Sequence, residues 1–233
     1  MDHGKPIIYV KNVRKVYRMG DEEVVALKRI NLRIYKGEVC CIFGTSGSGK
    51  STLLNQLAGM EKTTKGQVFI RGKNISDMNE EELAAFRQEH MSFIFQSYNL
   101  LPSMTAVENV AMPLMFKGMD RKRREAMAEE MLKRVGLSHR LHHYPSQMSG
   151  GQQQRAGIAR AFVSRPEVVY ADEPTGNLDT KTTAEIMDMV MGFARRFNQT
   201  IILVTHDPGM SRYADRIVTL VDGIITGDER KGQ

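Results

Sequence analysis

Two short runs of the chain, Val39 to Phe43 and Ile201 to Val204, are apolar at consecutive positions instead of alternating with polar residues. Strands that are covered on both faces have this pattern, and such strands occur in parallel sheets. Further runs of strand length are Ile7 to Val10, Asn31 to Tyr35, Gln67 to Arg71, Ser92 to Phe95 and Val168 to Ala171. The first two runs predict parallel strands buried on both faces, and the others predict further strands.

Helical periodicity dominates the middle of the chain, from about Met78 to Arg165. Three prolines are expected to break it: Pro102, Pro113 and Pro145. Separate helices are predicted at Ser51 to Met60 and at Lys181 to Phe197. Because strands precede and follow the helical stretch, the pattern predicts an α/β core that carries a helical insertion.

The most basic stretch, Arg121 to Arg124, opens a helix in this insertion. Apolar Met127, Met131 and Leu132 follow at helical spacing, and Gly136 supplies a signal for the end of the helix. We therefore interpret the arginines as the solvated face of an amphipathic helix and not as a nucleic-acid contact.

Composition and charge narrow the class of protein. The 233 residues are 41% hydrophobic and 26% charged, which excludes a disordered or fibrous chain. The net charge of +6 would suit a nucleic acid, an anionic lipid surface or a phosphorylated ligand, and charge alone does not choose among them. No apolar run approaches the ~20 residues of a membrane span, and Met1 to Pro6 is charged where a secretory signal is apolar. We expect a cytosolic location, with the adjacent Cys40 and Cys41 reduced.

Candidate chemistry begins at Gly44 to Ser51, which matches the phosphate-loop pattern GxxxxGK[ST]. The pattern lies between an apolar strand and a predicted helix, which is the context that it requires. Glycines let the backbone N–H groups wrap around phosphates at a helix N-terminus. Lys50 would contact the β and γ phosphates, and Ser51 would ligate Mg²⁺. The residues assigned to the bound nucleotide here are Gly44, Thr45, Ser46, Gly47, Ser48, Gly49, Lys50, Ser51 and Thr52.

Polar side chains also end two further strands, where α/β sheets place their ligands. Asp172 follows the strand at Val168 and suits the shell of a magnesium ion, while Glu173 could polarise an attacking water. His206 ends the strand that begins at Ile201, and we expect it to contact the γ phosphate. Three further histidines, His139, His142 and His143, could share a helix face and hold a metal. No nearby Cys or carboxylate completes a metal shell, so we do not interpret them as a metal site.

Ser149, Gly150 and Gly151 open a helix predicted to run to Phe162. A serine N-cap followed by exposed N–H groups makes a second element able to bind phosphate. The residues alone do not say whether it meets the same nucleotide as the phosphate loop.

Four segments, in order and spacing, resemble the nucleotide-binding cassettes of ATP-binding cassette (ABC) transporters: GTSGSGKST, MSGGQQQR, ADEPTGNLD and VTHD. The resemblance covers essentially the whole chain. Finer strings at Phe95 to Pro102, Thr105 to Val110 and Tyr144 to Gln147 are similar to the MacB and LolD branch. That branch includes macrolide and peptide export, lipoprotein release, peptide-antibiotic resistance and FtsE-like ATPases.

The resemblance implies a fold and a division of the chain. The fold is a P-loop NTPase (RecA-like) α/β core with a parallel sheet, an N-terminal antiparallel β subdomain and an inserted helical subdomain. Residues 1–96 and 166–233 would form the core, and residues 97–165 the helical subdomain.

The resemblance further implies an ATPase that uses ATP and Mg²⁺ and works as a head-to-tail homodimer. The residues of one copy that would close over ATP held by Lys50 of the other are Ser149, Gly150, Gly151 and Gln152. Gln96 would contact Mg²⁺ or water, and Asn177 to Asp179 would communicate between the two sites, with Asp179 near the nucleotide. Tyr17 is similar in position to the aromatic residue that stacks on adenine.

In this family the path for cargo comes from an integral membrane permease, so the resemblance implies a motor subunit at the inner face of the membrane that binds no cargo itself. The partner's coupling helix would dock near Gln96 and the segment after it. The methionines that offer an adaptable apolar surface there are Met104, Met112, Met115 and Met119. Three departures from the family pattern, Thr45, Met148 and Gly157, replace no phosphate ligand.

Two alternatives stay open at this point. A soluble ABC ATPase acting on nucleic acid or the ribosome would suit the basic charge, although the chain has one cassette, no coiled-coil insertion and no zinc-type cysteine set. A regulatory, FtsE-like ATPase would signal through a membrane partner without moving cargo.

Overall fold

The computed structural model describes residues 4–20 and 22–231, which form two compact units. The first unit contains the chain up to Arg87 together with the segment from Thr200 onward, and the second contains residues 88–199. The second unit is larger than the helical subdomain predicted at residues 97–165, and that subdomain division stays a prediction. Residues 1–3, part of the charged N-terminal segment considered above, lie outside the described residues.

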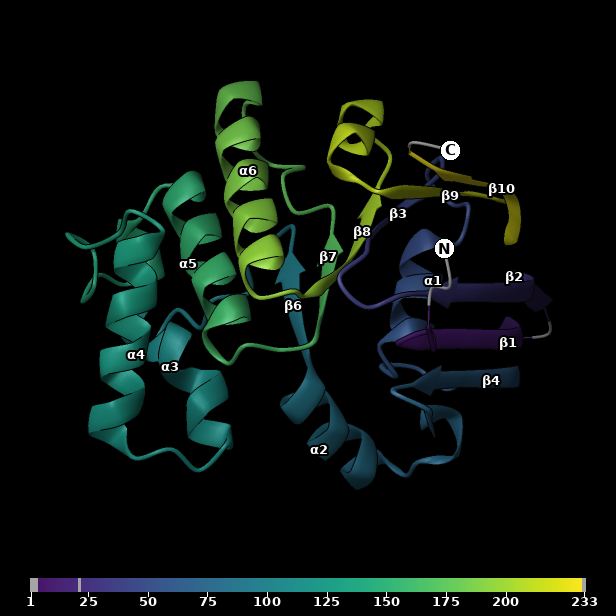
Figure 1. Ribbon diagram of the computed structural model, residues 1–233, viewed down its shortest axis with the longest axis horizontal. Coiled ribbons are helices and arrows are strands. Elements are labelled where there is room, and N and C mark those ends of the chain that lie inside the picture. Colours follow the sequence, from purple (N-terminus) through teal and green to yellow (C-terminus); the bar gives the residue numbers. More distant parts are fainter. Residues whose placement is uncertain (1–3, 21, 232–233) are drawn as a thin grey trace. The chain divides into compact units, whose positions relative to one another are not determined.

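The first unit holds an antiparallel sheet of order β2-β1-β4-β5 (Figure 1). Its strands are β1 (Ile8–Met19), β2 (Glu22–Ile34), β4 (Lys65–Ile70) and β5 (Lys73–Asn74). The strands β1 and β2 are much longer than predicted, because their charged outer halves hide the strand pattern. The β1 register shifts where Asn12 takes a φ of 51°, and Gly66 is needed opposite, since a Cβ there would lie 2.3 Å from the Asn12 carbonyl oxygen.

The same unit contains strands in the order β10-β9-β3-β8. Their bounds are β3 (Val39–Phe43), β8 (Thr200–Thr205), β9 (Arg216–Val221) and β10 (Ile224–Arg230). The strand β3 runs parallel to β8 and β9, and every residue of β8 is buried. The sequence therefore correctly predicts parallel strands covered on both faces. Cys40 and Cys41 are buried free thiols in β3, and burial raises the pKa of both.

The β9–β10 hairpin is absent from the sequence prediction. Its turn consists of Asp222 and Gly223, both at positive φ (47° and 72°). This is the geometry that an Asp-Gly pair favours between two antiparallel strands. The Asp-Gly pair was thus a signal that could have revealed the hairpin.

Two helices and two short 3₁₀ helices complete the first unit and the passage to the second. They are α1 (Lys50–Leu57), α2 (Glu80–His90), η1 (Ile75–Asp77) and η3 (Pro208–Tyr213). The helix α1 ends three residues earlier than predicted, where Ala58 caps it.

The second unit contains the parallel pair β6 (Met91–Phe95) and β7 (Val168–Asp172). Its helices are α3 (Ala106–Phe116), α4 (Arg121–Arg134), α5 (Gly150–Val163) and α6 (Thr180–Arg196), with the 3₁₀ helix η2 (Pro145–Gln147). The helices α3, α4 and α5 pack on one another (Figure 1). In the described part of the chain, no helix is both long and apolar enough to cross a bilayer.

One expectation for this unit was wrong. Pro113 does not break its helix, since α3 continues to Phe116 and buries Val110 and Leu114 against its neighbours. Burial of these side chains outweighs the backbone hydrogen bond that proline cannot make. The segment between α4 and η2 contains His139, His142 and His143, which therefore share no helix face. Among the described residues, no group of three His, Cys, Asp or Glu could hold a metal ion.

A buried arginine holds the C-terminal hairpin of the first unit. The Arg216 side chain is 9% exposed, and its Nε and Nη2 each donate to an Asp228 oxygen at 2.5 Å. Its Nη1 donates to the Arg33 carbonyl oxygen at 2.6 Å. The hydrogen bonds to Asp228 raise the pKa of Arg216, so the guanidinium stays charged at neutral pH.

We expect Asp228→Asn to lower the free energy of unfolding by about 1–3 kcal/mol, because a buried cation loses its bidentate partner. Urea unfolding measures this change. Glu23→Gln is the matched control, since the Arg18–Glu23 pair is 81% and 56% exposed, and it should cost less than about 0.5 kcal/mol. Equal effects of the two substitutions would contradict the assignment.

Candidate functional site

The loop between β3 and α1 packs so closely against neighbouring backbone that two of its glycines have no room for a side chain. A Cβ at Gly44 would lie 2.3 Å from the Leu220 carbonyl oxygen. Gly49 has a φ of 101°, and a Cβ there would lie 2.7 Å from the Ala26 carbonyl oxygen. Glycine is therefore required at both positions.

This loop presents N–H groups and a positive charge. The first bond of the α1 ladder runs from the Leu53 N–H to the Gly49 carbonyl at 2.8 Å, so the N–H groups of residues 50–52 precede the ladder. The Lys50 ammonium donates to the Thr45 carbonyl oxygen at 2.8 Å, which brings the charge back over the loop. The buried Ser48 Oγ has no hydrogen-bond partner among the described residues. Such a cradle at a helix N-terminus suits an anion with several oxygens.

His206 lies beside this loop. In the β3–β8 register, Phe43 pairs with Thr205, so Gly44 and His206 are the next residues at one edge of the sheet. His206 is exposed there. The first unit thus brings together two of the three strand ends predicted to share a site.

Tyr17, the predicted partner of the adenine ring, lies in β1 and is half-buried. Its hydroxyl donates to Glu61 Oε2 at 2.6 Å. Burial and this hydrogen bond raise the pKa of Tyr17, so the phenol stays neutral. No sequence motif indicated Glu61.

In the second unit, three predicted site residues lie at the carboxyl ends of the parallel strands β6 and β7: Gln96, Asp172 and Glu173. Phe95 pairs with Asp172 in the β6–β7 register, so Gln96 and Glu173 are the next residues at that edge. The Gln96 amide donates to Asn177 Oδ1 at 3.3 Å, and the Asn177 amide donates to the Gln96 carbonyl oxygen at 3.2 Å. Glu173 has a φ of 44°, a conformation that is strained for glutamate and is concentrated at functional positions.

The N-terminus of α5 is capped as predicted. Ser149 Oγ accepts from the Gln152 N–H at 3.3 Å, and Gln152 Oε1 accepts from the Ser149 N–H at 3.1 Å. A Cβ at Gly150 would lie 2.7 Å from the Tyr98 hydroxyl, and one at Gly151 would lie 3.2 Å from Thr182. The glycines therefore keep the start of α5 close to its neighbours.

Asp179 has a capping role that the sequence did not reveal. Its Oδ1 accepts from the Thr182 N–H at 3.0 Å and its Oδ2 from the Thr182 hydroxyl at 2.6 Å, at the start of α6. These hydrogen bonds lower the pKa of Asp179. The exposed carboxylate therefore stays ionised at neutral pH.

Sequence reasoning also missed Arg160. Its guanidinium donates to the carbonyl oxygens of Asn99 at 2.5 Å and Tyr98 at 2.9 Å. Both of those residues have positive φ (48° and 62°). Burial lowers the pKa of Arg160. Arg160 thus joins α5 to the segment that follows Gln96, a contact between distant positions that no local pattern signals.

A glycine loop between a buried parallel strand and a helix, in an α/β protein whose other parallel strands end in polar side chains, defines a phosphate-loop nucleotide-binding protein. More narrowly, the chain belongs to the ABC transporter family, whose family model matches residues 27–176. The family and the fold class predicted from the sequence are confirmed.

Relatives support this assignment over most of the chain. An uncharacterized ABC transporter ATP-binding protein of Methanocaldococcus jannaschii is 47% identical over 219 residues, covering 94% of this chain and 97% of the relative. The macrolide export ATP-binding/permease protein MacB of Pasteurella multocida is 45% identical over 224 residues, covering 96% of this chain. The chain spans about a third (34%) of that longer relative.

Solved structures agree. The dimeric structure of MJ0796, a bacterial ABC transporter cassette, is 43% identical, with a TM-score of 0.90, and the match covers 96% of this chain and 98% of that one. A dimeric post-hydrolysis state of MJ0796 bound to ADP and Pi is 42% identical, with a TM-score of 0.89 and the same coverage. This chain is thus an ATP-binding cassette of the ABC ATPase family.

We expect Arg160→Leu to expose the backbone of residues 98–101, because the two carbonyl groups at strained residues lose a charged donor. Hydrogen–deuterium exchange of these amides should accelerate about tenfold or more, as charged hydrogen bonds contribute ~1.5–3 kcal/mol. Arg160→Lys should restore part of the protection. Arg195→Leu, at an exposed position of α6, is the control, and equal exchange in it and Arg160→Leu would contradict the role of Arg160.

Proposed function

We propose that this chain is the ATP-hydrolysing subunit of an ABC transporter of MacB or LolD type and drives a separate membrane permease. The observation that carries the proposal is the phosphate loop, whose glycines close on the backbone at Leu220 and Ala26 and whose N–H groups precede the α1 ladder. Family membership supports ATP as the ligand.

In this proposal the loop binds the phosphates of ATP. The N–H groups at the start of α1 and the Lys50 ammonium neutralise the β and γ phosphate oxygens. Tyr17 stacks on the base, and His206 at the adjacent strand end contacts the γ phosphate. The other loop residues assigned above, including Ser46 and Thr52, lie around the phosphate chain.

The donor set suits magnesium. Ser51, Gln96 and Asp172 offer the hydroxyl, amide and carboxylate oxygens that this hard cation prefers, and no cluster of three acidic or histidine side chains among the described residues would compete as an all-protein cage. Magnesium usually keeps water and phosphate ligands besides one or two protein oxygens. These three residues would hold it, and its charge would offset that of the phosphates.

Glu173 provides the base for hydrolysis. It accepts a proton as a water oxygen bonds to the γ phosphorus, while the bond between that phosphorus and the β–γ bridging oxygen breaks, which leaves ADP and phosphate. Gln96, whose amide is held by Asn177, helps to orient the water.

A second copy completes the site. The N-terminus of α5 from one copy, comprising Ser149, Gly150, Gly151 and Gln152, covers ATP bound by the other, with Asp179 nearby. The cap geometry is compatible with this role, because Ser149 Oγ accepts from the Gln152 N–H and a hydroxyl can donate its own O–H at the same time. The dimeric MJ0796 structures support this assembly.

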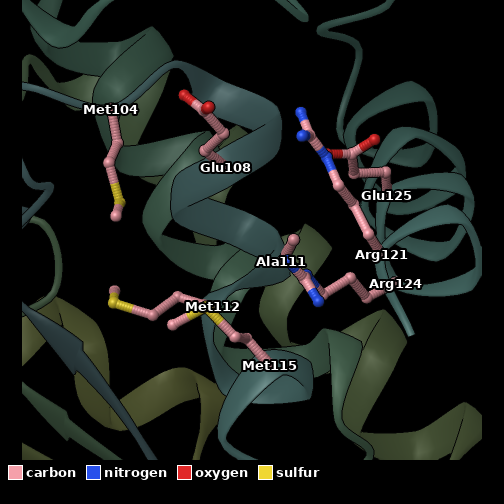
Figure 2. Close-up of a pocket in the computed structure, with 8 residues that line it drawn as sticks. All are labelled: Met104, Glu108, Ala111, Met112, Met115, Arg121, Arg124 and Glu125. Atoms are coloured by element: carbon pink, nitrogen blue, oxygen red, sulfur yellow. The ribbon is translucent and has the colours of Figure 1, made fainter. Parts of the chain in front are cut away.

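The permease contact lies at a pocket of about 240 Å³ between α3 and α4 in the second unit. Figure 2 shows Met104 and Met112 on one side of α3 and Arg121 and Glu125 on α4. Met115 and Phe116 at the end of α3 are 40% and 61% exposed. Flexible methionines beside ionic groups suit an amphipathic helix. MacB relatives, by name, join a permease to such a cassette, so we assign the pocket to a cytoplasmic helix of a permease, which would hold this chain at the inner membrane face.

We expect Glu173→Gln to abolish ATP turnover, by a factor of about 10² or more, while ATP still binds and pairs two copies. Phosphate release measures turnover, and size-exclusion chromatography with ATP detects the dimer. Lys50→Ala is the contrasting variant, because it should weaken ATP affinity itself. Turnover of Glu173→Gln at the original rate would remove Glu173 from its role.

We expect the double substitution Met112→Gln and Met115→Gln to reduce co-purification of an integral membrane protein by about tenfold, since apolar contact surface is lost. The bait is Glu173→Gln with ATP, isolated from detergent-solubilised membranes. Ile224→Gln, at a 42% exposed position in β10, is the control. Co-purification that is unaffected by the double substitution would contradict the assigned surface.

A further inference from the structure

A network of polar contacts surrounds Tyr17 in the first unit. Glu61 Oε2 accepts from the Tyr17 hydroxyl at 2.6 Å and lies 3.2 Å from the Lys15 ammonium. Glu61 Oε1 accepts from the Asn55 amide at 2.9 Å. Although burial acts to raise it, these hydrogen bonds hold the pKa of Glu61 below its ordinary value. The Glu61 carboxylate is therefore ionised at neutral pH, and both of its oxygens accept a hydrogen bond.

Lys15 is fixed as firmly as Glu61. Its ammonium donates to the Lys62 carbonyl oxygen at 3.0 Å, and its side chain is 14% exposed. The ammonium lies over the Tyr17 ring, 4.9 Å from the ring centre, a cation–π contact. One face of the ring is thus covered by a charge that contacts fix in place.

The network ties Tyr17 to the helix that follows the phosphate loop. Asn55 belongs to α1, and Glu61 lies four residues beyond the end of that helix. The Met60 N–H donates to the Asn55 carbonyl at 2.9 Å, which fixes the intervening turn. The ring and the phosphate loop are consequently attached to the same short helix.

We propose that Glu61 and Lys15 preset Tyr17 as a stacking platform for the nucleobase, with Glu61 fixing the ring and Lys15 covering one face so that the base stacks on the other. The inference rests on the proposed function, in which Tyr17 contacts the base. Glu61 and Lys15 are positioning residues that touch no nucleotide. Because stacking tolerates every base, the platform raises affinity for all nucleoside triphosphates through preorganisation.

The test compares ligands with and without a base. Isothermal titration of Glu61→Ala should show affinity for ATP and GTP reduced about three- to tenfold, the cost of ordering one ring on binding. Affinity for inorganic tripolyphosphate should stay unchanged, because the phosphate loop is intact. Tyr17→Phe, which keeps the ring and loses the hydroxyl, should match Glu61→Ala, and the double variant should be no weaker than either single one. Glu23→Ala, which removes an exposed carboxylate from the same sheet, is the matched control.

Three results would overturn the inference and leave the proposed ATP site in place. Unchanged ATP affinity in Glu61→Ala would show that the ring needs no support. A loss confined to ATP would make Glu61 a direct reader of adenine. Equal losses for ATP and tripolyphosphate would show that the substitution damages the phosphate loop. Failure of the unsubstituted chain to bind either ligand would overturn the proposed ATP site itself, and the platform with it.

Discussion

The phosphate loop depends on backbone approaching backbone at distances that exclude any side chain. An added Cβ at Gly44 would clash with the Leu220 carbonyl oxygen, and one at Gly49 or Gly223 would clash with the Ala26 carbonyl oxygen. The Gly223 N–H donates to the Ser48 carbonyl at 3.0 Å, so the tip of the β9–β10 hairpin is bonded to the loop itself. The antiparallel sheet and the C-terminal hairpin therefore hold the loop in place. The N–H groups of residues 50–52, which precede the α1 ladder, are left for an anion.

In the first unit, glycines let the phosphate loop pack against neighbouring backbone. In the second unit, buried side-chain amides hold the irregular loops in place. Asn109 is fully buried, donates to the carbonyl oxygens of Leu101 and Met104 and accepts from the Leu101 N–H at 2.7 Å. Gln154, also fully buried, donates to the Pro174 carbonyl oxygen one residue after Glu173. These loops could satisfy few of their backbone groups within regular structure, so a buried amide supplies the missing partners. The Gln154 amide thereby holds the backbone directly after Glu173.

The sequence predicts the parts of this protein that are governed by local chemistry. Apolar runs identified β3 and β8 because both faces are covered, and the spacing around Lys50 and Ser149 identified two helix N-termini. The outer halves of β1 and β2 were missed because charged residues there face solvent. Pro113 was misjudged because tertiary packing outweighed a local rule. Glu61 and Arg160 could not be predicted at all, since their partners lie 44 and 61–62 residues away.

On the proposed function, the residues that contact the base and the phosphates of a bound nucleotide are both attached to α1. Lys50 and Asn55 lie about 7.5 Å apart along α1, at 1.5 Å per residue, and a helix of eight residues does not bend appreciably over that length. The phosphate loop begins α1, and Glu61 is anchored on Asn55 near its end. A shift of α1 would thus move the phosphate loop and the Tyr17 ring together. On the proposed function, the unpredicted carboxylate at position 61 therefore sets the distance between base and phosphates, while the predicted loop alone sets where the phosphates lie.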